Sequence, residues 1–146
     1  MNASHKLLID LGADKIPHRD RTLYDHLSSV EKILQLCRCD ITVCTAGLLH
    51  SIYGTEFLKI SATTDRQKIK DIVGERSEYL IWVFCNANRP FCWFTGNNIP
   101  FRDGTHIHVD DKTLHELRMI ESANLIDQQQ APEIILSFSS INNLLD

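Results

Sequence analysis

The feature that most constrains the fold is a helical spacing of apolar residues after Thr22. These residues recur at intervals of four, three and four, which places them on one face of an α-helix: Leu23, Leu27, Val30 and Leu34. Thr22 directly precedes the run and has the hydroxyl side chain that favours a helix N-cap. The more apolar segment 41–50 predicts a second helix in the interior of the domain, ended by Gly54.

Breakers and caps divide the rest of the chain into further helices. We expect a short helix around 7–11 that stops at Gly12, helices over about 65–73 and 75–86, one from Asp110 or Asp111 to about Gln129, and a last one near Pro132. Residues 88–110 are rich in turn formers and predict a long loop with a small hairpin. The sequence therefore predicts an all-α bundle of six to seven helices, in a single domain spanning 1–146.

Composition and charge exclude several classes of function. The 146 residues carry a formal net charge of −4, so there is no basic excess to neutralise nucleic-acid phosphates. No apolar run approaches the length of a membrane span, and the polar N-terminus does not read as a secretory signal. We therefore expect a cytoplasmic protein with no nucleic-acid partner and no membrane partner.

The five cysteines fit the same interpretation. Their number is odd, and their spacing matches no common zinc pattern. We expect buried or half-buried free thiols that pack as small hydrophobic side chains.

Three polar side chains occupy the apolar faces of separate predicted helices: His26, His50 and Asn124. A polar group on a core face must find a hydrogen-bond partner or cost about 1–3 kcal/mol. Two interpretations stay open, namely three separately satisfied core residues or one shared functional site.

Short segments around these residues resemble the metal-ligand segments of the HD superfamily, in particular the hydrolase domain of the bifunctional alarmone enzymes. The segments are 24–30, Ala46-Gly47-Leu48-Leu49-His50-Ser51, Val73-Gly74-Glu75 and Glu121-Ser122-Ala123-Asn124. The resemblance implies an HD-like helical bundle. It also implies that four metal-ligand positions are held here by His26, His50, Ser51 and Asn124.

The chain is also identified as a member of the DUF6817-like proteins, a family of unknown function that resembles a divergent HD branch. The agreement covers Leu11-Gly12-Ala13-Asp14, Pro17-His18, Arg21, His26-Leu27, segment 46–55, Arg66, Val73-Gly74-Glu75 and Phe84-Cys85. This resemblance implies a fold and brings no established activity.

The two positions at which an HD site has aspartate are neutral here, as Ser51 and Asn124. Two imidazoles with a hydroxyl and an amide are a poor ligand set for a hard divalent cation. Zinc would require a third nitrogen or sulfur ligand, for which His18 is the candidate. We expect no metal and no other cofactor, while retention of a metal through His18, His26 and His50 stays open.

Without a metal, neutral imidazoles suit general acid–base chemistry. The first hypothesis is a metal-independent enzyme acting on a small polar or phosphorylated molecule, with His26 and His50 as acid and base. The expected substrate-binding residues are His18, Arg21, Ser51, Tyr53, Arg66 and Asn124. The two arginines suit a carboxylate or phosphate, and they equally suit the anchoring of surface loops.

Two alternatives remain. One is a catalytically silent HD-like domain that binds a ligand or a protein, in which the polar cluster is a buried hydrogen-bond network. The other is a degenerate metal-dependent phosphohydrolase. The expected partner is a small-molecule ligand, with a homodimer left open. His106 and His108 fit either a metal pair or an exposed hairpin.

Overall fold

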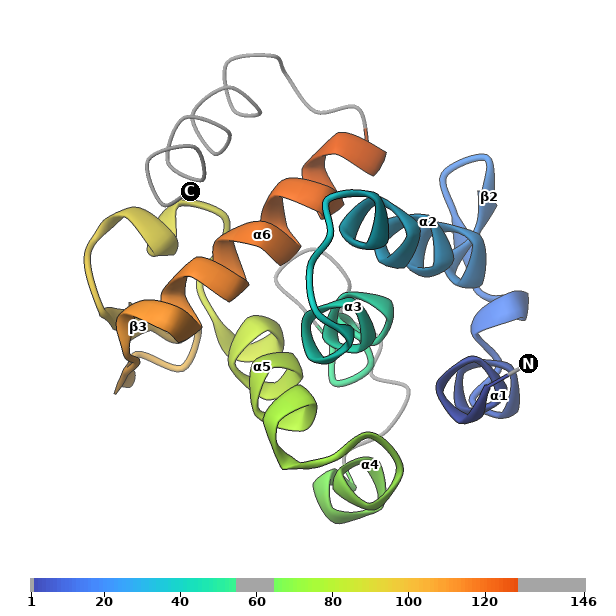
Figure 1. The fold of residues 1–146 in the computed structure, drawn as a ribbon, viewed down its shortest axis with the longest axis horizontal. Helices are drawn as coiled ribbons and strands as arrows, with labels where there is room; N and C mark the ends of the chain where they lie inside the picture. Colours follow the sequence, from blue (N-terminus) through green and yellow to red (C-terminus); the bar gives the residue numbers. More distant parts are fainter. Residues whose placement is uncertain (1, 55–64, 129–146) are drawn as a thin grey trace.

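The computed structural model describes residues 2–54 and 65–128, which form a helical bundle with two small two-stranded sheets (Figure 1). The elements are α1 (Ala3–Asp10), η1 (Ala13–Lys15), β1 (Pro17–His18), β2 (Arg21–Thr22), α2 (Leu23–Leu36), α3 (Ile41–Leu48), α4 (Arg66–Val73), α5 (Glu75–Asn86), η2 (Phe91–Phe94), β3 (Asn98–Pro100), β4 (His106–His108) and α6 (Asp111–Asp127). The predicted all-α class is confirmed. The helix expected near Pro132 lies outside the described residues.

Helix α3 lies at the centre of the bundle. Helices α2, α5 and α6 all pack against it, and α2 also packs on α6 (Figure 1). The interior helix predicted over 41–50 is therefore found in place, although it ends at Leu48. His50 and Ser51 lie in the turn that follows, and both are buried.

The helix ends follow the capping chemistry of the sequence. Thr22 accepts a hydrogen bond from the Asp25 backbone N–H, and the Asp25 carboxylate accepts one from the Thr22 N–H, which completes a capping box. At α4 and α6 the cap is a single hydrogen bond, in which the side chain of Asp65 or Asp110 accepts from the backbone N–H three residues later. Gly74 has φ of 89° at the junction of α4 and α5, a left-handed conformation that favours glycine.

The long loop predicted over 88–110 contains the hairpin β3–β4, with Ile99 opposite Ile107. His106 and His108 are exposed on it, as the hairpin interpretation predicts. Trp93 is fully buried and its ring stacks on Phe84 with centroids 5.8 Å apart. The loop is therefore fastened to the bundle through Trp93.

All five cysteines are free. Cys44, Cys85 and Cys92 are buried and Cys39 is half-buried, as predicted, whereas Cys37 is exposed at the end of α2. In the part of the chain that the structure describes, no helix is both long and apolar enough to span a bilayer.

Gly47 marks a close approach between α3 and α2. A Cβ atom at this position would lie 2.2 Å from Leu34 Cδ1, and Leu34 is itself fully buried. The glycine in this chain is therefore explained by packing, since Leu34 fills the space that an alanine methyl group would need.

We expect Gly47→Ala to lower the free energy of unfolding by about 1–2 kcal/mol. Overpacking costs about 1–3 kcal/mol, which outweighs the gain of up to about 1 kcal/mol in helix propensity. Urea unfolding measures the change. Ile41→Ala, on the 80% exposed side chain of the same helix, is the control and should stay within about 0.5 kcal/mol of the wild type. A Gly47→Ala protein as stable as the wild type would contradict this packing argument.

Candidate functional site

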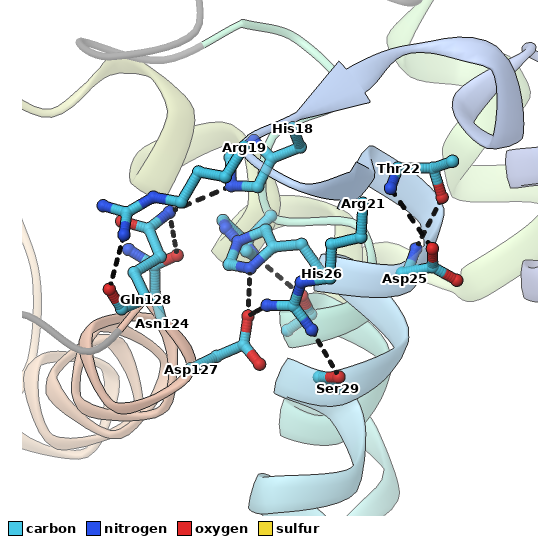
Figure 2. Close-up of polar contacts among 12 residues, drawn as sticks. His18, Arg19, Arg21, Thr22, Asp25, His26, Ser29, Asn124, Asp127 and Gln128 are labelled. Carbon is cyan, nitrogen blue, oxygen red and sulfur yellow. Dashed lines mark hydrogen bonds and ion pairs between the residues drawn. The ribbon is translucent and has the colours of Figure 1, made fainter.

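The candidate site lies where strands β1 and β2, helix α2 and the C-terminal end of α6 meet (Figure 2). His26 sits on the first turn of α2 and is 1% exposed. The capping box at Thr22 fixes where α2 begins, and this start places His26 on the face that packs against α6.

Asp127 joins two of the predicted site residues. Its Oδ2 atom lies 2.5 Å from His26 Nδ1, and the same oxygen accepts a hydrogen bond from Arg21. Arg21 also donates to Ser29 Oγ at 3.2 Å. One largely buried carboxylate therefore links α6 to both α2 and β2, and its negative charge is compensated by the Arg21 guanidinium.

The contact with Asp127 fixes the protonation pattern of His26. A carboxylate accepts, so Nδ1 carries the proton and Nε2 keeps a lone pair. Burial lowers the pKa of His26 to about 4, and this effect exceeds the upward influence of the hydrogen bond to Asp127. At neutral pH the ring is therefore uncharged, with Nε2 available as a proton acceptor.

His50 lies beside His26 with the two rings edge to face and their centroids 5.3 Å apart. Its Nδ1 donates to the Gly47 carbonyl oxygen at 2.7 Å. Burial, followed by the neighbouring His26, holds the pKa of His50 well below its ordinary value. Both histidines are thus neutral and protonated on Nδ1.

His18 covers the face of His26. The two rings stack with centroids 4.4 Å apart and planes 22° apart. Burial and the nearby Arg19 and Arg21 lower the pKa of His18. Figure 2 shows His18 on β1, with the Gln128 side chain reaching toward it.

Asn124 reaches this group through Gln128. The Gln128 Nε2 atom lies 3.4 Å from His18 Nε2 and 3.4 Å from Asn124 Oδ1. Asn124 Nδ2 in turn donates to Glu121 Oε2 at 3.0 Å. Glu121 forms a buried ion pair with Arg89 at 2.6 Å. A line of polar contacts therefore runs from the core to His18.

Three of the predicted substrate-binding residues have other surroundings. Tyr53 donates to Glu78 Oε2 at 3.0 Å, and Arg66 binds both Glu78 oxygens at 2.7 and 2.9 Å. Glu78 is fully buried, and the Arg66 guanidinium compensates its charge. Ser51 is buried, and its Oγ has no hydrogen-bond partner among the described residues.

An open cavity of about 530 Å³ lies next to the Asp127 carboxylate. Its lining among the described residues is Arg19, Asp20, Arg21, Asp127 and Gln128. The two arginines and two aspartates give this cavity both signs of charge. Neither His26 nor His50 belongs to that lining.

The residues at the HD-like metal positions form an incomplete ligand set. Asn124 uses its amide in contacts with Glu121 and Gln128, whereas His26 and His50 each donate from Nδ1 and keep the Nε2 lone pair through which a histidine can bind a metal. Within residues 2–54 and 65–128, no three His, Cys, Asp or Glu side chains converge as ligands. The absence of a metal stays a prediction.

Asp127 and Gln128 are not among the site residues predicted from the sequence. The HD resemblance places the last acidic position at Asn124 and implies a site without negative charge, whereas Asp127 supplies a carboxylate to His26. A signal was present, because residues three and four positions after Asn124 lie on the same side of a helix.

Comparison of the sequence with family models shows the family of this chain. A family model described as a domain of unknown function, DUF6817, matches residues 7–89, and the chain belongs to that family. No curated protein and no solved structure matches the sequence. The predicted membership is confirmed, and the wider HD resemblance stays a prediction.

We expect the stability of the protein to fall as the pH falls from 7 to 5. The pKa of His26 is about 4 in the folded chain and about 6.5 when unfolded, so the unfolded chain binds more protons in this range. The contribution is fully present above pH 6.5 and is lost toward pH 4. It amounts to about 2 kcal/mol between pH 7 and 5 for His26, and His50 adds in the same direction.

Urea unfolding at pH 7 and pH 5 measures this loss. His26→Gln should reduce the difference between the two pH values by about 2 kcal/mol, whereas His106→Gln, on the exposed hairpin, should leave it unchanged. Equal pH dependence in the wild type and in His26→Gln would show that His26 is not held neutral by the fold.

Proposed function

We propose that this member of the DUF6817 family is a metal-independent enzyme that binds a small polar or phosphorylated molecule and uses His26 as a general base. The observation that carries the proposal is the contact of 2.5 Å between Asp127 Oδ2 and His26 Nδ1. A carboxylate that holds Nδ1–H leaves Nε2 as the acceptor, and it stabilises the imidazolium that forms when the ring takes a proton.

The surrounding charges support a polar ligand. Arg19 and Arg21 line the cavity of about 530 Å³ together with Asp20 and Asp127. A guanidinium binds a carboxylate or phosphate through two parallel hydrogen bonds. The ligand would therefore carry an anionic group, held at the cavity while its reacting part lies toward His26.

His26 performs both directions of proton transfer in this proposal. The pKa of His50 is held well below its ordinary value, so His50 is uncharged at neutral pH and does not serve as the acid. The proposal therefore keeps only His26 of the predicted acid–base pair in proton transfer. His26 takes a proton from the substrate and returns it to the product, while His50 supports the ring edge to face.

A second candidate is a ligand-binding domain without catalysis. It is favoured by the burial of both imidazoles and by the His18 ring that lies over His26. In that case the cavity binds the ligand through Arg19 and Arg21, while the histidines only stabilise the fold.

A ligand screen followed by exchange with solvent distinguishes the two candidates. We would titrate the protein with phosphorylated sugars, nucleotides and carboxylic acids and follow the imidazole signals by NMR. Each binding compound would then be incubated with the protein in D₂O, and deuterium incorporation or product formation would be measured. We expect turnover that His26→Gln reduces by at least about 100-fold with little change in affinity.

Arg21→Met should weaken binding by about tenfold or more, because it removes a charge-assisted hydrogen bond. His106→Gln is the control for both readouts. Binding that depends on Arg21, without turnover or exchange for any compound, would support the silent domain instead. Turnover unaffected by His26→Gln would contradict the proposed base.

A further inference from the structure

The β1–β2 hairpin places the side chain of His18, on β1, over the ring of His26. His18 stacks on the His26 ring at 4.4 Å, so the imidazole below is 1% exposed. None of residues 17–22 is buried. A segment with so little buried apolar surface opens at low free-energy cost compared with a packed helix.

The hairpin is fixed differently at its two ends. At its base, the Leu23 backbone N–H donates to the Ile16 carbonyl at 2.8 Å, and the capping box at Thr22 anchors the start of α2. At its tip, Arg19 donates to the Gln128 carbonyl oxygen at 2.8 Å, and His18 contacts the Gln128 side chain. The base is thus held by backbone bonds and the tip by side chains that reach the end of α6.

Arg19 has an unfavourable backbone conformation. Its φ is 59°, in the left-handed region that a residue with a Cβ adopts only at a cost in free energy. The bond from its guanidinium to Gln128 offsets this cost, because the last carbonyl groups of a helix carry partial negative charge. Glycine would fit this backbone better. The contact of the Arg19 side chain with Gln128 therefore explains why arginine occupies the tip.

We propose that the outer part of the β1–β2 hairpin, residues 17–20, is a lid over His26 and that Arg19 is its latch. Opening moves the His18 ring away and joins the space above His26 to the cavity lined by Arg19, Arg21 and Asp127. The purpose of the lid rests on the proposed function, since a ligand in that cavity reaches His26 Nε2 only when His18 has moved. Arg21, bonded to Asp127 and Ser29, stays with α2 at the base of the hairpin.

Chemical modification of the histidines tests the lid without any ligand. Diethyl pyrocarbonate acylates neutral, accessible imidazoles, and trypsin cleavage after Arg21 separates the peptides of His18 and His26 for mass spectrometry. We expect Arg19→Gly to raise the rate of His26 modification by about threefold or more, because losing the charge-assisted hydrogen bond that favours the closed form outweighs the relief of backbone strain that glycine brings.

Arg38→Gly is a matched control, because Arg38 is also left-handed, with φ of 61°, and lies at the other end of α2. It should leave the His26 rate unchanged. His18→Ala provides a second route and should raise the His26 rate at least as much as Arg19→Gly, with circular dichroism verifying that each variant is folded.

An unchanged His26 rate in folded Arg19→Gly would overturn Arg19 as the latch. An unchanged rate in folded His18→Ala would overturn the lid itself. Failure of the proposed function is a separate result: the lid opens in these variants, yet no compound binds to or reacts with the wild-type protein. If the wild-type protein turns over a ligand and neither substitution changes the rate of His26 modification, the lid is contradicted and the proposed function is not.

Discussion

The carboxylate of Asp127 is the group on which the arrangement of the site depends. It lies at the end of α6 and accepts hydrogen bonds from His26 on α2 and from Arg21 on β2. A largely buried carboxylate is tolerable only when its charge and lone pairs are satisfied. Both partners are therefore needed together, and the contact between α6, α2 and the hairpin is held by charge as well as by apolar packing.

Much of the helical fold could be predicted from local chemistry. Thr22, Asp65 and Asp110 cap the helices that they precede in the sequence, and Gly74 ends α4 where expected. These outcomes depend on spacing and on short-range hydrogen bonds, which a sequence displays directly. The end of α3 was placed two residues too late, because the apolar pattern continues through the turn that holds His50.

The site was only partly predictable. Burial of His26 and Asn124 follows from their positions on apolar helix faces, whereas His50 is buried in the turn after α3 and the partners of all three depend on how the helices pack. Arg66 was predicted to lie with the histidines, yet the Arg66 guanidinium binds the buried Glu78. Asp127 was not predicted, because the resemblance points to Asn124, one helical turn earlier. Partners separated by about a hundred residues leave no trace in local spacing.

The central claim is that burial keeps His26 neutral while Asp127 fixes its proton on Nδ1. Burial and the adjacent Arg21 charge outweigh the upward influence of the carboxylate on the pKa, and the short contact with that carboxylate selects the nitrogen that carries the proton. Nitrogen-15 NMR of the imidazole at pH 7 tests the claim most directly. The account predicts a protonated Nδ1 and an unprotonated Nε2, and Asp127→Asn should change this pattern. A proton on Nε2 alone, or a fully protonated ring, would contradict it.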